Sequence, residues 1–308
     1  MNSYQYAPGL VGPQPMPENI RYDSAAFRMA YKMMYLSTRL SRPERGTKRR
    51  RIRLRVEGGE SIPCYVVEPG QVQKGKNSIV YIHGGAFVAE LSKYNLQIAS
   101  YFARELGCKV FLPEYRTAFC VKYPVPVEDC IGAIRAIYDR RTEFGIGEKM
   151  ALYAESSGAC LALASALRAR DESNSPISFQ MLLCPCLDYK ASGESYRQFP
   201  HAAIPTSLIQ WAWGNYLDGR EPENVGDASP LYADDFRGLP KTYIEAEEFD
   251  CLRDDAKALY QKLREAGGDT EYHMALGSYH GVEAEFETEY VKKLLAKRCA
   301  ALAKALMA

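Results

Sequence analysis

The sequence has almost no net charge, because 39 Lys and Arg residues face 38 Asp and Glu residues among 308, which gives a formal charge of +1. Such a balance provides no overall field that would draw the chain to nucleic acid or to an anionic membrane. No apolar run approaches the ~20 residues needed to span a bilayer, and residues 1–20 lack the basic and apolar regions of an export signal. We therefore expect a cytoplasmic protein with no membrane span and no nucleic-acid partner.

Histidine is also scarce, with four residues in the chain, whereas cysteine is present nine times. An odd number of cysteines cannot all pair within one chain, and without an export signal we expect buried, reduced thiols. Cys184 and Cys186 flank Pro185, but no second Cys pair or His cluster completes the spacing of a zinc site. The sequence therefore predicts no metal and no cofactor.

Residues 1–45 differ from the rest in being rich in Pro, Tyr and Met. Within them, apolar residues at three- and four-residue steps predict a helix over 23–40, capped by Asp23 or Ser24. This helix could pack against the body of the protein or form a lid over a pocket. Residues 46–308 are expected to form one large domain, in which the aromatic-rich stretch 190–235 is an insertion that could supply a second lid piece.

The remainder predicts an α/β fold. Residues 47–70 alternate charged and apolar side chains around a turn at 57–60, which is typical of an antiparallel hairpin with one wet face. From residue 78 onward, short apolar runs alternate with amphipathic segments, which predicts a doubly wound, mostly parallel sheet. The predicted strands after the hairpin are 78–82, 108–115, 149–155, 178–185, 241–248 and 270–276, and a closing helix is predicted over 282–308. Active groups in such sheets gather at the carboxyl ends of the strands.

Two stretches at predicted strand ends contain residue patterns suited to acyl chemistry. "HGGAF", residues 83–87, offers consecutive backbone N–H groups that could bind a developing negative oxygen, although it also suits a plain turn. "AESSG", residues 154–158, places Ser156 between small residues, as a nucleophile elbow requires. On its own, a serine here could equally cap the following helix.

His280 lies in a predicted loop after the last strand, downstream of an acidic strand end. With Ser156 and Asp250 it gives the chain order Ser, Asp, His that α/β-hydrolases use. Asp254 and Glu248 are rival acids. We prefer Asp250 because Asp254 is expected to begin the following helix and Glu248 to close the strand.

Taken together, these stretches resemble the hormone-sensitive-lipase family of α/β-hydrolase carboxylesterases. The resemblance covers about residues 77–285, and its motifs, in order, are "YIHGGAF", "PEYRTAF", "YPVPVEDC", "AESSGACLAL", "DASPL", "EFDCLRDDAKALYQKLREAG" and "YHGVE". Two departures stand out: Ala86 replaces the third loop glycine, and Glu155 stands where the family has Asp. Both leave the predicted nucleophile, base and acid in place.

The resemblance implies an α/β-hydrolase fold with an eight-stranded, mostly parallel twisted sheet, flanking helices and a helical cap made by residues 1–45 and 190–235. It implies that Ser156 attacks an ester carbonyl, that His280 moves the proton, and that Asp250 orients His280.

It also implies an oxyanion hole formed by the backbone N–H groups of Gly85, Ala86 and Ser157. His83 and Gly84 would position that loop, with His83 excluded as the catalytic base. We therefore predict a serine carboxylesterase acting on short-chain acyl esters, including acetyl esters.

Two alternatives remain open at this point. The same fold could bind a small molecule without turning it over, or the same residues could cleave amides or peptides. The resemblance also raises a homodimer as an expectation that no sequence feature decides.

Overall fold

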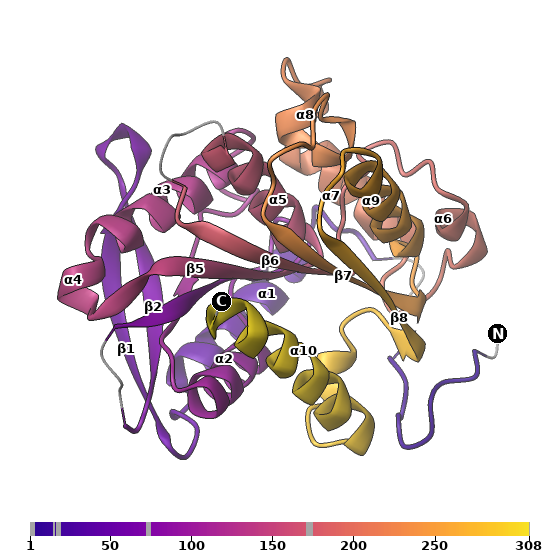
Figure 1. Cartoon of the computed structure of the whole chain (residues 1–308). Coiled ribbons are helices and arrows are strands. Elements are labelled where there is room, and N and C mark those ends of the chain that lie inside the picture. The colour runs from indigo at the N-terminus through magenta and orange to yellow at the C-terminus, as the bar shows by residue number, and fades with distance from the viewer. Residues whose placement is uncertain (1–3, 15, 17–19, 72–74, 171–174, 308) are drawn as a thin grey trace.

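The computed structural model describes residues 4–14, 16, 20–71, 75–170 and 175–307. Its centre is one twisted eight-stranded sheet with the strand order β1-β2-β4-β3-β5-β6-β7-β8 (Figure 1). The strands are β1 (Thr47–Arg55), β2 (Ser61–Pro69), β3 (Lys76–Ile82), β4 (Val110–Pro113), β5 (Ile146–Glu155), β6 (Ile177–Leu183), β7 (Lys241–Phe249) and β8 (Thr270–Tyr279). β2 is antiparallel to both β1 and β4, and the other neighbours are parallel. The predicted eight-stranded, mostly parallel sheet is therefore confirmed.

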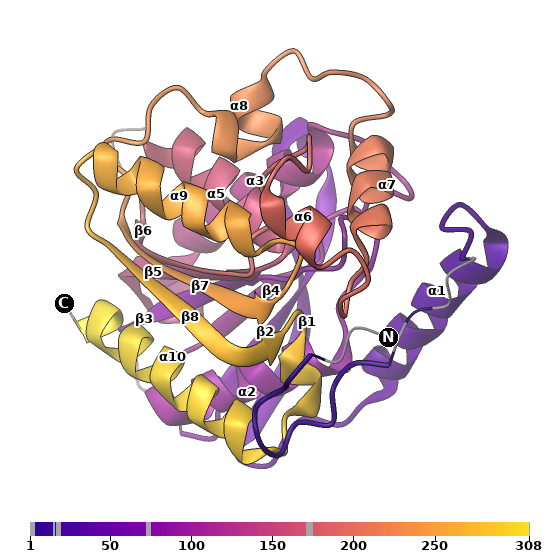
Figure 2. The same cartoon turned by 90° about the vertical axis from the view of Figure 1, so that its right-hand side faces the viewer.

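Helices cover both faces of this sheet. The helices are α1 (Ala25–Leu40), α2 (Lys93–Leu106), α3 (Val125–Asp139), α4 (Arg141–Phe144), α5 (Ser157–Arg170), α6 (Glu194–Gln198), α7 (Thr206–Tyr216), α8 (Val225–Ala228), α9 (Arg253–Glu265) and α10 (Glu289–Met307). α3, α5 and α9 lie on one face, and α2 and α10 lie on the other (Figure 2).

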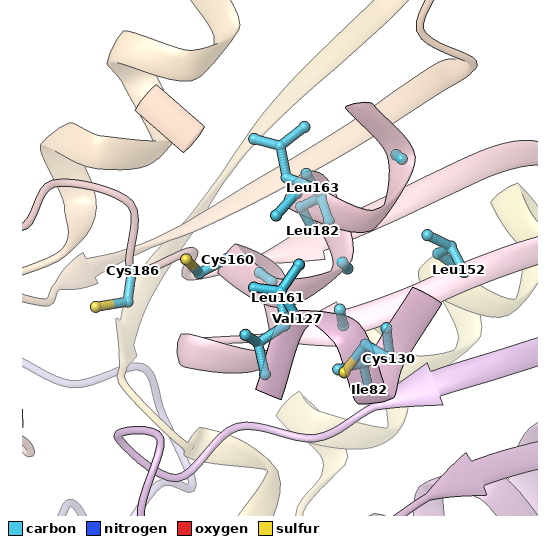
Figure 3. Packing of buried hydrophobic residues seen from close by; sticks show 14 of the residues in the cluster. Ile82, Val127, Cys130, Leu152, Cys160, Leu161, Leu163, Leu182 and Cys186 are labelled. Carbon is cyan, nitrogen blue, oxygen red and sulfur yellow. The ribbon is translucent and has the colours of Figure 1, made fainter. Parts of the chain in front are cut away.

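Each face has its own apolar core. Figure 3 shows Val127 of α3 and Leu161 of α5 among the buried side chains that pack with Ile82 and Leu152 of the sheet. A second cluster joins the opposite face of the sheet to α2 and α10. The near-continuous apolar strands follow from this arrangement, because a parallel strand that is covered on both faces must be apolar on both.

The last part of the chain differs from its predicted boundaries. β8 continues to Tyr279, beyond the expected end at 276, so that His280 directly follows the strand. The final helix begins at Glu289 and not at Val282, because Gly281 has a φ of 75° and starts a short 3-10 turn over Val282–Glu285. The hydroxyl of Thr288 then accepts a hydrogen bond from the N–H of Val291, as an N-cap does.

The predicted N-terminal helix forms as α1, with the Ser24 hydroxyl accepting a bond from the Phe27 N–H at 3.1 Å. α1 stands beside the body of the protein (Figure 2). At one end the rings of Phe27 and Trp211 of α7 meet edge to face, with centroids 5.8 Å apart. At the other, Tyr35 and Arg51 both hydrogen-bond to the carboxylate of Glu114. Residues 1–3, 15 and 17–19 of the predicted cap segment lie outside the described residues.

The stretch 190–235 contains α6, α7 and α8 and connects β6 to β7. Its α7 packs on the loop after β3, where the ring of Phe87 stacks on Tyr216 with centroids 4.2 Å apart and an interplanar angle of 9°. The insertion therefore touches both α1 and the loop "HGGAF".

Within the described ranges, no helix combines the length and the apolarity that crossing a lipid bilayer demands.

The start of α5 packs against the loop after β3 at Gly158. A Cβ atom built on Gly158 would lie 2.3 Å from the carbonyl oxygens of both Ile82 and His83. Only glycine allows helix and loop to come this close. The approach fixes the position of the β5–α5 turn relative to the loop.

We predict that Gly158→Ala lowers the free energy of unfolding by about 2 kcal/mol or more, because its methyl group would force backbone apart in a close-packed region. Gly214→Ala is the matched control: Gly214 lies in α7 with open space around it, so alanine should leave stability unchanged or raise it slightly. Denaturant unfolding followed by circular dichroism measures both. Equal stability of the two variants would contradict the packing argument.

Candidate active site

Ser156 occupies the sharp turn between β5 and α5 with a φ of 54°, a left-handed conformation that is uncommon for residues other than glycine. Its N–H donates to the carbonyl of Leu183 on β6 at 2.9 Å. Its own carbonyl accepts from the N–H groups of Ala159 and Cys186. These bonds hold the backbone in a strained shape and place the hydroxyl at the positive N-terminus of α5.

The side chains of Ser156, His280 and Asp250 form one hydrogen-bonded row. His280 Nε2 lies 3.0 Å from Ser156 Oγ, and His280 Nδ1 lies 2.7 Å from Asp250 Oδ2. Asp250 is fully buried, and its second oxygen accepts from the N–H of Leu252 at 3.0 Å. An Nδ1–H donated to Asp250 leaves the Nε2 lone pair free to accept the serine proton.

The two rival acids are engaged elsewhere. Asp254 lies in the first turn of α9 and accepts a bond from the N–H of Ser195 at 2.9 Å. Glu248 accepts from the N–H of Gly277 at 2.6 Å. Asp250 is therefore the carboxylate that contacts His280.

The surroundings of His280 shift its pKa upward. Burial alone would favour the neutral ring, but the adjacent Asp250 carboxylate outweighs it and raises the pKa, with further contributions from Glu283 and Glu155. A raised pKa makes the ring a stronger base toward the Ser156 hydroxyl. It also means that His280 is protonated, and unable to accept that proton, at the acid end of the pH range.

The loop after β3 turns its backbone toward Ser156. Gly85 has a φ of 122°, and Ala86 and Phe87 have φ values of 53° and 61°. In the part of the chain that is described, the N–H groups of Gly85, Ala86 and Ser157 donate to no acceptor. Gly85 and Ala86 line the same cavity as Ser156. Such free, fixed donors are what an oxyanion requires.

The hydroxyl of Ser157 makes a contact that the sequence analysis missed. It accepts a hydrogen bond from the N–H of Phe87 at 3.0 Å and so ties the loop to the elbow. The pattern "SSG" could have suggested a second use for this serine, but the long-range partner is visible only in the fold.

His83 is buried within the loop and is not part of the hydrogen-bonded row of Ser156, His280 and Asp250. Its Nδ1 is 2.8 Å from the Gly84 carbonyl, and its ring stacks on Tyr115 with centroids 4.5 Å apart. Burial lowers the pKa of His83 to about 4, so this ring is neutral at physiological pH. Tyr115 also donates to the His83 carbonyl at 2.9 Å.

A cavity of about 190 Å³ opens at Ser156 and His280. Its walls come from the loop after β3, from α1, from the 190–235 insertion and from the loop after β8. The lining residues are Tyr31, Gly84, Gly85, Ala86, Tyr94, Glu155, Ser156, Cys184, Ile204, Leu208, Ile209, His280, Gly281 and Glu283. Both predicted lid segments thus contribute apolar side chains to the space beside Ser156.

Two glutamates in this cavity were not predicted to belong to the site. Glu155 accepts bonds from Tyr94 at 2.9 Å and Asn95 at 2.6 Å, and burial, followed by the charge of Glu283, raises its pKa to about 7. Glu283 accepts from Arg298 of α10 at 2.6 Å. Their positions in the sequence, next to Ser156 and three residues after His280, could have indicated that they belong to the site.

Metal-donor atoms also meet here. Among the described residues, the candidate group is Cys184, Asp250 and His280, whose donor atoms all lie within 4.8 Å of one another.

We predict that Asp250→Asn lowers the pKa of His280, because it removes the charge that raises this pKa and leaves the burial that opposes it. Proton NMR titration of the His280 ring in the full chain measures the change. Asp254→Asn, four residues away, is the control and should leave the titration unaltered. An unchanged His280 pKa in Asp250→Asn would contradict the assigned contact.

Comparison with known proteins places this chain in a family. The profile of the alpha/beta hydrolase fold family matches residues 79–284, which is more than half of the chain. An arylesterase of Saccharolobus solfataricus is 26% identical over 235 residues, covering 75% of this chain and 76% of that protein. An acetyl esterase of Salmonella choleraesuis is 28% identical over 220 residues, covering 66% of this chain and 64% of that enzyme.

The solved structure of a bacterial heroin esterase superposes with a TM-score of 0.85 at 27% identity and covers 94% of each chain. The chain therefore belongs to the alpha/beta hydrolase fold family and, as its sequence predicts, to the hormone-sensitive-lipase-like carboxylic ester hydrolases within it.

Proposed function

We propose that this protein is a serine carboxylesterase that hydrolyses short-chain acyl esters, with acetyl esters as its preferred class. The observation that supports this most directly is the row from Ser156 through His280 to Asp250, with contacts of 3.0 and 2.7 Å at the mouth of a small cavity.

In the first step, Ser156 Oγ attacks the ester carbonyl while His280 Nε2 takes the hydroxyl proton. Asp250 stabilises the resulting imidazolium and stays ionised. The proton then passes from His280 to the departing alkoxide, so that the alcohol leaves and an acyl-serine remains.

The carbonyl oxygen becomes negative during this attack. We assign its stabilisation to the N–H groups of Gly85, Ala86 and Ser157, which have no other acceptor in the described chain. Fixed donors stabilise the transition state more than water does, because they need not reorient. Ser157 would act twice, through its N–H and through the hydroxyl that holds Phe87.

Hydrolysis of the acyl-serine repeats the sequence with water. His280 removes a proton from a water molecule, the hydroxide adds to the acyl carbon, and the proton returns to Ser156 Oγ as the acid is released. The cavity supplies the entry path, since both Ser156 and His280 line it.

The size of the cavity supports a short acyl group. Its volume of about 190 Å³ is below the roughly 300–1,000 Å³ of pockets that enclose drug-sized ligands. Ile204, Leu208 and Ile209 give it an apolar wall that would accept a methyl or short alkyl group. The similarity to an acetyl esterase and an arylesterase agrees with this choice.

We further propose that residues 1–45 and 190–235 act as the cap over this cavity. Tyr31 of α1 reaches the cavity from one side, and Leu208 of α7 reaches it from the other. The edge-to-face contact of Phe27 and Trp211 would hold the two cap pieces together.

We predict that Ser156→Ala lowers kcat/KM for p-nitrophenyl acetate by about 10⁴-fold or more, because it removes the hydroxyl that is hydrogen-bonded to His280 Nε2. Ser157→Ala is the matched control. It keeps the backbone N–H and loses the hydroxyl that accepts from Phe87, so it should cost about tenfold or less, near the value of one buried hydrogen bond. Equal losses in the two variants would contradict the assignment of the nucleophile.

The alternatives from the sequence are tested in the same assay. Binding of the ester by the native chain without turnover would indicate a ligand-binding protein, and faster cleavage of matched anilides than of esters would indicate an amidase.

We predict that Tyr31→Ala raises the rate for longer acyl chains relative to acetate, because it removes a ring that lines the cavity. A series of p-nitrophenyl esters of increasing chain length measures this ratio. Met33→Ala is the control on the same helix, since Met33 is 58% exposed and faces away from the cavity lining. An unchanged chain-length profile in Tyr31→Ala would argue against α1 as part of the cap.

A further inference from the structure

Cys184 stands at the carboxyl end of β6, directly beside the proposed catalytic row. Its φ is 36°, and its N–H donates to the carbonyl of Glu245 at 2.8 Å, so the backbone fixes the position of the thiol. The side chain is 3% exposed and lines the same cavity as Ser156. Among the described residues, the thiol has no hydrogen-bond partner.

Cys184 and Cys186, the two cysteines that flank Pro185, belong to apolar clusters on opposite faces of the sheet. Cys186 belongs to the apolar cluster on the α3–α5 face, near Cys160 (Figure 3). Cys184 belongs to the cluster on the other face and reaches the cavity. The metal-donor groups near Cys184 are those of His280 and Asp250, and the donor atoms of the three residues all lie within 4.8 Å of one another.

Buried carboxyl groups lie near these donors. Arg298 is fully buried and contacts three buried carboxylates, with Glu283 at 2.6 Å, Glu247 at 3.9 Å and Glu245 closest. Both oxygens of Glu247 are buried without a hydrogen-bond partner. One guanidinium cannot neutralise three carboxylates, so this region attracts a further cation or holds protons in its place.

The thiol of Cys184 carries a proton that a metal ion must displace. A divalent metal ion does so, because a thiol that coordinates it is deprotonated by its charge.

We propose that Cys184, His280 and Asp250 form an inhibitory binding site for a thiophilic divalent metal ion, of which Zn²⁺ is the representative. Zinc takes sulfur, imidazole nitrogen and carboxylate oxygen in a tetrahedral arrangement, and a water molecule from the cavity would supply the fourth ligand. Mg²⁺ and Ca²⁺ prefer oxygen ligands throughout and would be excluded.

Binding of the metal ion releases one proton from the protein. The thiol proton of Cys184 leaves to solvent, the thiolate, imidazole nitrogen and carboxylate oxygen each donate an electron pair to the metal, and no group is oxidised. The neutral imidazole of His280 keeps its single proton on the nitrogen that the metal does not occupy.

Coordination would stop catalysis. Asp250 lies on the Nδ1 side of the ring, so a metal ion that binds His280 and Asp250 together takes Nδ1. A metal on Nδ1 displaces the bond to Asp250 and leaves the proton on Nε2, so the ring can no longer act as base. The inhibitory consequence rests on the proposed function, whereas the binding itself does not.

Binding is tested on the catalytically blocked Ser156→Ala chain by calorimetric titration with ZnCl₂ after dialysis against EDTA. We expect one zinc ion per chain, and Co²⁺ in place of zinc should give the near-ultraviolet charge-transfer absorption of a thiolate ligand. Adding Cys184→Ala or Cys184→Ser should abolish that absorption and weaken zinc binding by at least the roughly tenfold that loss of even a supporting group costs a metal site. Cys186→Ala is the matched control and should preserve both signals.

Inhibition is tested on the chain with Ser156 intact. Zinc should suppress hydrolysis of p-nitrophenyl acetate, EDTA should restore it, and MgCl₂ should have no effect. Relative to its own metal-free rate, Cys184→Ala should be markedly less sensitive than Cys186→Ala.

Two results separate this proposal from the proposed function. Equal zinc affinity in the Cys184 and Cys186 variants, or the absence of a cobalt–thiolate band in a folded chain, would overturn the metal site. Stoichiometric zinc binding that depends on Cys184, in a native chain with no esterase activity, would support the metal site and overturn the proposed function.

Discussion

The close approach of the β5–α5 turn to the loop after β3 is the constraint on which the site depends. Gly158 lets the backbone of α5 reach the carbonyls of Ile82 and His83, and Ser156 is held in a left-handed conformation by bonds to β6 and the chain beyond it. A strained residue persists only where its surroundings hold it on several sides. The same packing brings free N–H groups of the loop to the serine, so the proposed nucleophile and the proposed oxyanion hole are positioned by one contact.

Much of this could be predicted from the sequence, for identifiable reasons. The alternation of apolar and amphipathic segments predicted the mostly parallel sheet. The small residues around Ser156 predicted the sharp turn between β5 and α5. What escaped prediction depends on long-range contacts: the bond between the Ser157 hydroxyl and Phe87, the approach of Cys184 to His280, and the start of α10 at residue 289. Side chains that meet only after folding leave no periodic pattern, and one glycine with a positive φ was enough to shift the start of a helix.

Buried charge behind the site has two opposing effects. Asp250, with smaller contributions from Glu283 beside Arg298 and from Glu155, raises the pKa of His280 and so strengthens it as a base. Burial, followed by the charge of Glu283, raises the pKa of Glu155 to about 7, and both oxygens of Glu247 are buried without a hydrogen-bond partner, which is costly for stability. Buried polar groups of this kind are retained at sites where chemistry requires them. The arrangement favours basicity at His280 over the stability that apolar replacements would give.

The helix α7 contacts both the cavity and the loop after β3. Leu208 and Ile209 contact the cavity, whereas Tyr216 stacks on Phe87, which lies in the loop proposed to bind the oxyanion and donates its N–H to Ser157. Diversifying the first pair would retune which ester fits, while altering Tyr216 would disturb the chemical step for every ester alike. To change the ester selectivity of this scaffold, a designer would therefore vary Leu208 and Ile209 and keep Tyr216 unchanged.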